Sequence, residues 1–574
     1  MKTHLLAMLT AAVAVVAACT DYGAPTPANK QRAGKPSPDT QPLDPFWRNA
    51  TVYFLMTDRF ANGDRANDTS LGRKQDADLL RGFEGGDIQG VTEKIRAGYF
   101  SLLGVDAIWT TPLIENSHGS VVEKEWGKTY AYHGYWPRDW TKVDPNFGSE
   151  ADLAAMIATA HERGIRVLAD VIINHAGAPT PVDPVWPETW VRRGPTCDYK
   201  SYAGSVPCEL SFTLQDILTE SEAPVELPDF LIKAWRNEGR LDREMMELDV
   251  FFARTGYPRA PKYYIVKWLT DWVRDYGIDG FRVDTAKHVD PEIWAVLKRE
   301  ASLALKEWKA SHPDAKIDDR EFYMVGEVFN YGLSGFASAV DGGRAYDYGD
   351  RQVDFFDYGF DALSNMAFPT HAQASARILF NQYSDELEDG PFSGKGIINY
   401  ITSHDDMNPF DPNRSMTFES AAKLMLAPGA VQIYYGDEVG RDLTIEGAKG
   451  DATLRSNMDW AQAETSTGAA LLSHWRKLGK FRQAHLAIGA GRHSEISASA
   501  PYVFSRVLDE AREADRVVIA MDLVPGRAAI PVGDIWPEGA HVRDAYSGVA
   551  GVVKDGYVNL SNAGTLALLE EVHY

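Results

Sequence analysis

The sequence predicts an α/β protein built on a (β/α)8 barrel, with an insertion after the third strand and a C-terminal antiparallel β domain. Three observations lead to this prediction. Short strand-like runs alternate with amphipathic helical stretches between residues 46 and about 479, which is the pattern of a parallel barrel. One connection, after the third run, is far longer than an ordinary loop. Beyond about residue 485 the runs change to a strand-only pattern.

The predicted barrel strands are short runs rich in β-branched and aromatic residues. They are residues 51–56, 105–110, 165–172, 280–284, 322–327, 361–366, 399–403 and 431–435. Amphipathic stretches lie between them. In one of these, Leu153, Met156, Ile157 and Ala160 share one face, as the helical period requires.

The connection from residue 175 to about 261 shows no clear strand–helix unit. It is rich in proline and acidic residues, and a connection of this length is usually a functional loop or a small domain. After residue 485, runs such as 516–524 predict a small antiparallel β domain.

Length and composition fit a soluble globular protein of more than one domain. A chain of 574 residues is too long for one core, and 44% apolar residues is an ordinary content. The formal charge of −23 disfavours nucleic acid and anionic membrane surfaces as partners. It suits a neutral substrate without identifying one.

The N-terminus has the pattern of an export signal. Lys2 and His4 precede an apolar run, residues 5–18, that is too short to span a bilayer comfortably. The run ends in VAAC, which resembles a bacterial lipobox, so Cys19 is predicted to be lipidated. The alternative is an ordinary signal peptide cleaved nearby. Residues 19–45 are then a flexible tether, and the lipid is the predicted contact with a membrane.

Two further cysteines, Cys197 and Cys208, lie in the long connection. An exported chain meets an oxidising compartment, so we expect them to form a disulfide within one loop. Two free thiols are the alternative. The sequence holds no zinc-type cluster.

The segment GFRVDTAKHV, residues 280–289, concentrates charged side chains at the end of a predicted strand. Arg282 and Asp284 are two residues apart, so on a strand both point to the same face. An arginine beside a carboxylate lowers its pKa and keeps it ionised at neutral pH, as a carboxylate nucleophile requires. The alternative is a structural Arg–Asp ion pair.

Three other segments end β-rich runs with an acid or a histidine: DVIINH with His175, VGEVF with Glu327, and INYITSHDD with His404 and Asp405. Parallel barrels collect catalytic groups at these strand ends. In this order the four segments resemble the signature regions of the α-amylase family of retaining glycoside hydrolases. LPDF, residues 227–230, resembles that family's LPDL motif with Phe for Leu. Residues 131–148 and 426–438 resemble its bacterial periplasmic subgroup.

The resemblance covers residues 46 to the high 400s and implies a TIM barrel with a domain B inserted after the third strand. The predicted division is a signal peptide (1–18), a tether (19–45), the barrel (46–175 and 261–484), domain B (176–260) and a C-terminal β domain (485–574).

The resemblance also implies the chemistry. Asp284 matches the nucleophile and Glu327 the acid/base, which in retaining enzymes lie about 5 Å apart. A neighbouring carboxylate favours the protonated form that an acid needs. Asp405 matches the third acid, which orients sugar hydroxyls. Alone, each acid could be a solvated or salt-bridged carboxylate.

Further residues match the family's substrate-binding positions. His175 and His404 match the histidines at the cleavage subsite, and Tyr135 matches the aromatic on which that sugar stacks. Lys287 and His288 match a pair on the reducing side of α-1,4-acting enzymes. Asp170 is expected to support Arg282, and Arg455, with Asp451, matches a late sugar-binding pair. The alternative for each histidine is a structural hydrogen-bonding role, and the alternative for Tyr135 is a core tyrosine.

Two calcium sites are implied, one more strongly than the other. Asn174, Asp229 and the carbonyl of His288 match the site between barrel and domain B. The second set is Asn62, Asp64, Asn67, Asp68, Asp87 and the carbonyl of Gly85. Its alternative is a polar turn rich in Asn and Asp.

The leading function is therefore an endo-acting α-1,4-glucan hydrolase, exported and lipid-anchored in the cell envelope. The alternatives are cyclomaltodextrinase, maltogenic or transglycosylating action on the same scaffold, and a glycan-binding lipoprotein without catalysis. The three intact acids argue against the last. The sequence leaves the preferred glucan, product size and oligomeric state open.

Overall fold

The computed structural model describes residues 42–572, apart from 212, 334–342 and 511–512. Cys19 and the whole predicted signal peptide lie outside the described residues. Within the described part of the chain, no helix is long and apolar enough to cross a membrane.

Eight parallel strands close into a barrel in the order β1-β16-β15-β14-β11-β10-β7-β2, which confirms the predicted fold class. The strands are β1 (Thr51–Leu55), β2 (Ala107–Thr110), β7 (Arg166–Val171), β10 (Gly280–Val283), β11 (Tyr323–Gly326), β14 (Ala362–Asn365), β15 (Gly396–Asn399) and β16 (Ala430–Tyr434). Most of their side chains are buried, because helices cover the outside of the barrel and side chains fill its interior.

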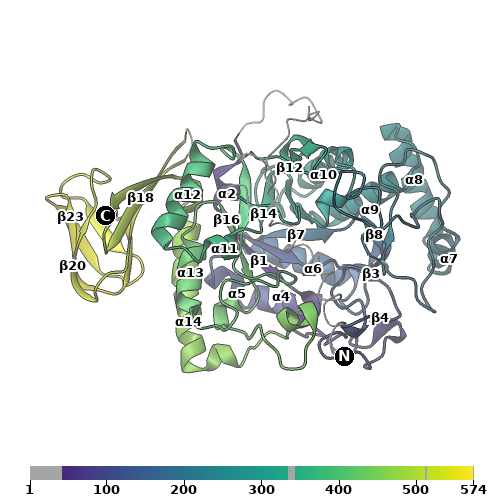
Figure 1. Ribbon diagram of the computed structural model, residues 1–574, viewed down its shortest axis with the longest axis horizontal. Coiled ribbons are helices and arrows are strands. Elements are labelled where there is room, and N and C mark those ends of the chain that lie inside the picture. The colour runs from purple at the N-terminus through teal and green to yellow at the C-terminus, as the bar shows by residue number, and fades with distance from the viewer. Residues whose placement is uncertain (1–41, 212, 334–342, 511–512, 573–574) are drawn as a thin grey trace, which may run out of the picture.

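The main covering helices follow the strands in turn (Figure 1). They are α4 (Ile88–Arg96), α6 (Glu150–Glu162), α9 (Pro261–Tyr276), α10 (Glu292–Ser311), α12 (Ala376–Glu388), α13 (Thr417–Met425) and α14 (Ser466–Ala484). The predicted apolar face of α6, with Leu153, Met156, Ile157 and Ala160, is buried. Ser149 and Asp152 form a capping box that starts this helix.

The seventh strand differs from the prediction. The predicted run was residues 399–403, but the strand is Gly396–Asn399. Ile397 and Ile398 supply the buried β-branched pair, and Asn399 already pairs with Asn365 and Val431. Ile401 is also buried, so the loop after the strand has the apolar character of a strand without its pairing.

The insertion between β7 and β10 holds more regular structure than the sequence indicated. A short pair, β8 (His175–Ala176) and β9 (Gln215–Asp216), is followed by α7 (Asp229–Asn237) and α8 (Leu241–Thr255). The LPDF motif opens α7. Leu248, Phe251 and Phe252 form the buried face of α8.

The connection from β2 to α6 contains strands that the sequence analysis did not identify. β3 (Ile114–Asn116) pairs with β6 (Pro137–Val143), and β4 (Val121–Glu123) forms a hairpin with β5 (Gly127–Thr129).

The predicted C-terminal antiparallel sheet is present. It has the order β17-β18-β19-β24-β21-β22-β23-β20 and stands beside α12 and α14 (Figure 1). The strands are β17 (Arg492–Ser497), β18 (Tyr502–Glu510), β19 (Glu513–Met521), β20 (Gly526–Pro531), β21 (His541–Asp544), β22 (Ala550–Lys554), β23 (Tyr557–Ala563) and β24 (Leu566–Glu571). Part of it encloses a core of its own, including Val518, Trp536 and Leu569.

Candidate active site

Asp284 and Glu327 leave adjacent barrel strands at the same height. β10 and β11 are in register, with Val283 opposite Gly326. The backbone ladder continues one step past the strands, because Asp284 N donates to Val171 O and Glu327 N donates to Val283 O, both at 2.9 Å. Each carboxylate is therefore fixed at the carboxyl end of its strand, where barrel enzymes do their chemistry.

One guanidinium connects three carboxylates in this site. Arg282 Nη1 donates to Asp284 Oδ1 at 2.8 Å and to Asp170 Oδ1 at 3.1 Å. Arg282 Nη2 lies 3.1 Å from Glu327 Oε2. Asp170 also accepts from Tyr135 Oη at 2.7 Å and from Trp109 Nε1 at 3.0 Å. The expected support of Arg282 by Asp170 is present.

The direction of the pKa shift of Asp284 differs from the sequence prediction. Burial and the nearby charge of Glu327 raise the pKa of Asp284 well above its usual value, although Arg282 lowers it. Burial likewise raises the pKa of Asp170 to about 6. Arg282 therefore does not offset the burial of Asp284 and Asp170, and each of these two carboxyl groups binds a proton more readily than a solvated acid. The expected lowering of the Asp284 pKa by Arg282 is therefore outweighed by burial and by Glu327.

His404 and Asp405 face this cluster from the loop after β15. The rings of His404 and Tyr135 stack, with centroids 5.4 Å apart. His404 Nε2 lies 3.4 Å from Asp405 Oδ2. Burial raises the pKa of Asp405, although 40% of its side chain stays accessible. Arg455 holds the loop by donating to the His404 carbonyl at 2.9 Å, and it pairs with Asp451 at 2.7 Å.

The site histidines are buried and uncharged at neutral pH. Burial lowers the pKa of His175 to about 4 and of His288 to about 3. The nearby charges include Lys287, which lowers the pKa of His288 further. His175 Nε2 donates to the Tyr135 carbonyl at 3.0 Å. A neutral imidazole has a single N–H, and in His175 and His288 it is bonded to a backbone carbonyl, so the other ring nitrogen can accept from a sugar hydroxyl without adding charge.

Lys287 lies just after β10, the strand that leads to Asp284. Its Nζ donates to Phe329 O at 3.1 Å and to Tyr346 Oη at 3.2 Å. Burial lowers its pKa to about 8. His288 next to it donates from Nδ1 to Ser205 O at 2.8 Å.

Cys197 and Cys208 are joined by a disulfide. The loop that they close contains Ser205, whose carbonyl accepts from His288. The disulfide loop is therefore attached directly to the strand end that carries Asp284.

The residues around Asn174 fit a calcium ion, with one change from the predicted ligands. Asp229 lies exposed in the first turn of α7. The carboxylate beside Asn174 is Asp216, which is 3.5 Å from the Asn174 amide and 1% exposed. Asp216 Oδ1 is buried without a hydrogen-bond partner, and burial raises the pKa of this group to about 7. A buried carboxylate oxygen without a partner suits a cation.

The sequence analysis did not identify Asp216 as a calcium ligand, because the LPDF motif indicated Asp229 instead. The segment Leu214–Ile217, LQDI, has a similar Leu-x-Asp-aliphatic pattern and was the available signal. The segment after Asp216 also reaches the loop that carries His288, since Thr219 Oγ1 accepts from Asp290 N at 3.4 Å.

The second predicted calcium set is gathered where two segments meet, residues 62–68 and residues 85–87. Asp87 accepts from the backbone of Gly63 and Asp64 and from the Asn67 amide. Asn62 donates to Asp68 at 2.9 Å, and Gly85 approaches both so closely that a Cβ would lie 2.5 Å from Asn62 Nδ2. Asn67 Oδ1 is buried without a partner. This second set of residues also fits a cation, but its carboxylates already accept several hydrogen bonds.

Both sites depend on oxygens other than clustered carboxylates. Within the described ranges, no group of three or more His, Cys, Asp or Glu side chains is placed to hold a metal. Asparagine side chains and backbone carbonyls would supply the remaining ligands.

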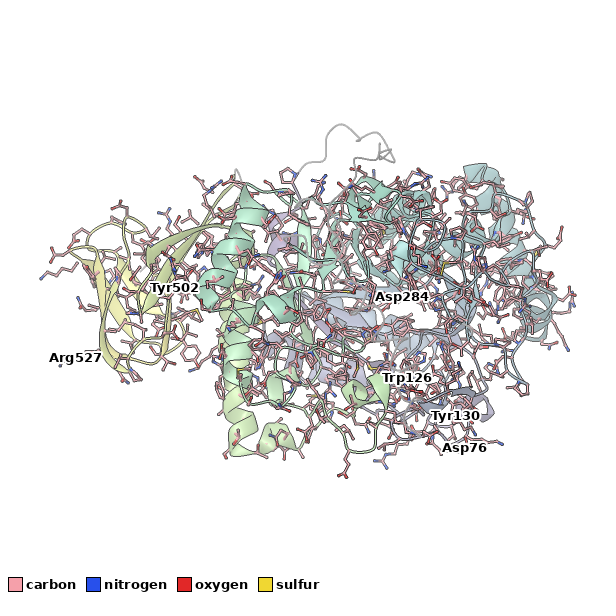
Figure 2. All side chains as sticks on the ribbon, viewed as in Figure 1. Asp76, Trp126, Tyr130, Asp284, Tyr502 and Arg527 are labelled. Carbon is pink, nitrogen blue, oxygen red and sulfur yellow. A yellow bond between two sulfur atoms is a disulfide. The ribbon has the colours of Figure 1, made fainter. Side chains whose placement is uncertain are left out.

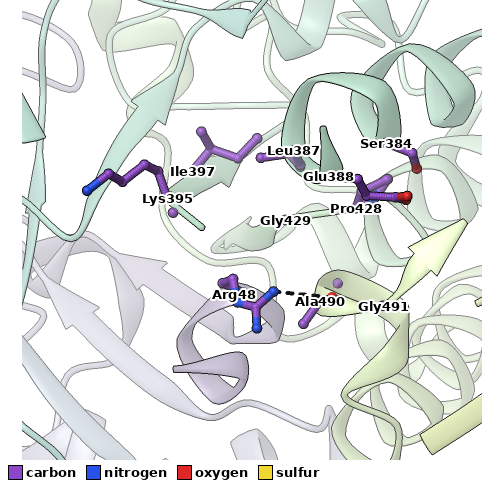
Figure 3. Close-up of a pocket in the computed structure, with 12 residues that line it drawn as sticks. Arg48, Ser384, Leu387, Glu388, Lys395, Ile397, Pro428, Gly429, Ala490 and Gly491 are labelled. Carbon is purple, nitrogen blue, oxygen red and sulfur yellow. Dashed lines mark hydrogen bonds between the residues drawn. The ribbon is translucent and has the colours of Figure 1, made fainter. Parts of the chain in front are cut away.

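The cavity drawn in Figure 3 lies away from these residues. It is lined by Gly396, Ile397 and Gly429, at the amino ends of β15 and β16, and by Arg48 and Ala490. The candidate catalytic side chains lie at the opposite ends of the strands, so this cavity is not the candidate active site.

Comparison with known proteins agrees with this geometry. Residues 54–485 match the family model of the α-amylase catalytic domain. The chain belongs to the α-amylase family, glycoside hydrolase family 13. It is 36% identical over 529 residues to the periplasmic α-amylase of Escherichia coli (strain K12), covering 82% of this chain and 72% of that protein.

Two further comparisons match at lower identity. A cyclomaltodextrinase from Bacillus sp. is 27% identical over 499 residues, covering 84% of this chain and 74% of that protein. Among solved structures, the α-amylase from Geobacillus thermoleovorans superposes with a TM-score of 0.62 at 21% identity, covering 92% of this chain and 99% of that one. That structure shares the fold.

Proposed function

We propose that this enzyme is an exported α-amylase that hydrolyses internal α-1,4-glucosidic bonds of starch, glycogen or maltodextrins with retention of configuration. The observation that carries the proposal is the Arg282 bridge between Asp284 and Glu327, at 2.8 and 3.1 Å. Two carboxylates bound to one guanidinium suit the separation of about 5 Å that retaining hydrolysis needs.

In the first step, an Asp284 oxygen attacks the anomeric carbon and forms a covalent glycosyl ester. Glu327 gives its proton to the leaving glycosidic oxygen, so the bond to the reducing-side sugar breaks. In the second step, Glu327 removes a proton from water, and the water oxygen displaces Asp284. The two inversions together retain the α configuration, and both carboxyl groups return to their starting states.

Arg282 supports each step through electrostatics. It bonds Asp284 in the free enzyme and stays within reach when the ester forms and the charge moves to Glu327. Thr285 N donates to Glu327 Oε2 at 2.9 Å. This bond orients the acid/base toward Asp284.

The choice of α-1,4 bonds is supported by Lys287 and His288, which follow β10 and resemble the reducing-side pair of α-1,4-acting enzymes. Export follows from the N-terminal pattern and from the relative named as periplasmic. Calcium bound by Asn174 and Asp216 would connect the insertion to the barrel. Lipid attachment at Cys19 would keep the enzyme in the cell envelope.

A cyclomaltodextrinase activity is the second candidate, because a protein of that name is also related along most of the chain. Products from starch, pullulan and cyclodextrins distinguish the two. An α-amylase removes the iodine colour of starch quickly and releases mixed maltooligosaccharides. Faster hydrolysis of cyclodextrins than of starch would favour the second candidate. If neither substrate is hydrolysed, the proposal is refuted.

A further inference from the structure

The hairpin of β4 and β5 carries a partly exposed tryptophan beside the active-site face. Trp126 lies in the turn between the two strands and is 38% exposed. In the view of Figure 2 it lies between Asp284 and Asp76. A large exposed aromatic ring next to a carbohydrate site needs a physical account, because most tryptophans are largely buried.

Arg81 fixes this hairpin to the rest of the site. Its side chain is buried, and its Nη1 donates to Glu123 Oε2 at 3.0 Å. Its Nη2 donates to Lys449 O at 2.7 Å and to Asp451 Oδ1 at 2.9 Å. The guanidinium also lies 5.1 Å from the centre of the Trp126 ring. The ring is therefore held in place.

One part of the Trp126 ring rests on the loop before Asp451. Gly450 has a φ of +57°, and a Cβ at this position would lie 2.8 Å from the ring. Asp451 pairs with Arg455, and Arg455 donates to the His404 carbonyl. A continuous chain of contacts thus runs from the catalytic loop outward to Trp126.

The barrel order places this chain of contacts opposite Lys287. Arg81 follows β1, Trp126 follows β2 and Asp451 follows β16, three neighbouring strands. Lys287 follows β10, and its partner Phe329 follows β11. In the ring of eight, β16 lies opposite β10 and β1 lies opposite β11. If Lys287 contacts the reducing side of the substrate, Trp126 lies on the non-reducing side.

We propose that Trp126 is a stacking platform for a glucosyl unit on the non-reducing side of the cleavage point, beyond the sugars next to Asp405 and Arg455. The C–H face of a pyranose ring is apolar and matches an exposed indole. The inference rests on the proposed α-glucan hydrolysis and adds to it a preference for chains long enough to reach the hairpin.

The test measures kcat/KM on maltooligosaccharides from maltotriose to maltoheptaose. For Trp126→Ala we expect a loss of about tenfold on the longest chains, mainly through KM, and little change on the shortest. Trp126→Phe should keep most of the activity on long chains. The matched control is Tyr557→Ala, which removes a 46% exposed aromatic from the C-terminal sheet. It should leave every chain length unchanged.

A second readout reports the binding register. Maltoheptaose labelled at its reducing end should give longer labelled products with Trp126→Ala than with the wild type, because fewer sugars are held on the non-reducing side. Equal loss on all chain lengths, faster cleavage of long chains or an unchanged product pattern would overturn the proposal. Failure of the wild type to cleave any maltooligosaccharide would instead refute the proposed function.

Discussion

Arg282 and Asp170 form a two-contact ion pair inside the barrel, with Nη1 3.1 Å from Oδ1 and 3.2 Å from Oδ2. Asp170 is also bound by Tyr135 and Trp109. The same guanidinium also contacts Asp284 and Glu327, at 2.8 and 3.1 Å. Its charge is therefore shared among three carboxylates, and burial and Glu327 raise the pKa of Asp284 in spite of it.

The first prediction concerns the nucleophile. Asp284→Asn should reduce starch hydrolysis by several orders of magnitude, because the amide cannot form the glycosyl ester. Asp319→Asn, which changes an 83% exposed side chain, is the control and should hydrolyse normally. Near-normal turnover by folded Asp284→Asn would contradict the assignment. NMR of the first wild-type products should show the α-anomer, and initial β-anomer would exclude retention.

The second prediction separates the two candidate calcium ligands. Asp216→Ala should abolish the rise in melting temperature that calcium gives to chelator-treated protein, since a ligand that binds the folded state stabilises it by mass action. The exposed Asp229→Ala should respond to calcium as the wild type does. The opposite result would restore Asp229 as the ligand. If substitutions at Asp64 and Asp68 remove the calcium-dependent rise in melting temperature while Asp216→Ala keeps it, the second site holds the stabilising ion.

The third prediction concerns the contact between barrel and C-terminal sheet. His485 Nδ1 lies 2.9 Å from Asp515 and Nε2 lies 2.8 Å from Glu570. Both nitrogens donate to carboxylates, so the ring is charged. Although burial opposes this, the two acids raise its pKa to about 9. The stability that these two ion pairs give to the folded state is fully present below about pH 6.5, the ordinary pKa of histidine. It is lost as the pH rises through 9.

The free energy of unfolding of the wild type, measured with denaturant, should accordingly fall between pH 6.5 and 9, by an amount on the order of 3 kcal/mol. His485→Gln should be less stable at pH 6.5 and should show a flatter profile across this window. His541→Gln changes an exposed histidine in the same sheet and should keep the wild-type profile. Equal slopes for His485→Gln and the wild type would disprove the role of this ion pair.

The fourth prediction concerns the N-terminus. Radiolabelled palmitate should enter the wild-type protein but not Cys19→Ala, and starch hydrolysis should be unaffected because the catalytic groups lie far along the chain. Equal labelling of both proteins, or labelling of neither, would refute lipidation at Cys19.

Much of the site could be predicted because Asp284 and Glu327 follow their strands directly, whereas Asp405 lies further along the loop after β15. Asp284 and Glu327 end runs with clear β character, and strand ends of a parallel barrel meet at one face whatever the loops do. The position of β15 was less clear, since buried Ile401 extends the apolar run past the last paired residue, Asn399.

The sequence by itself determined the barrel, the C-terminal sheet and the order of the catalytic acids, because these depend on local periodicity and on short motifs. The tertiary structure decided which carboxylate meets Asn174, how burial and Glu327 change the pKa of Asp284, and that Trp126 lies against Gly450. These properties depend on groups that are distant in the chain and on their removal from water. Spacing along the sequence does not determine either quantity.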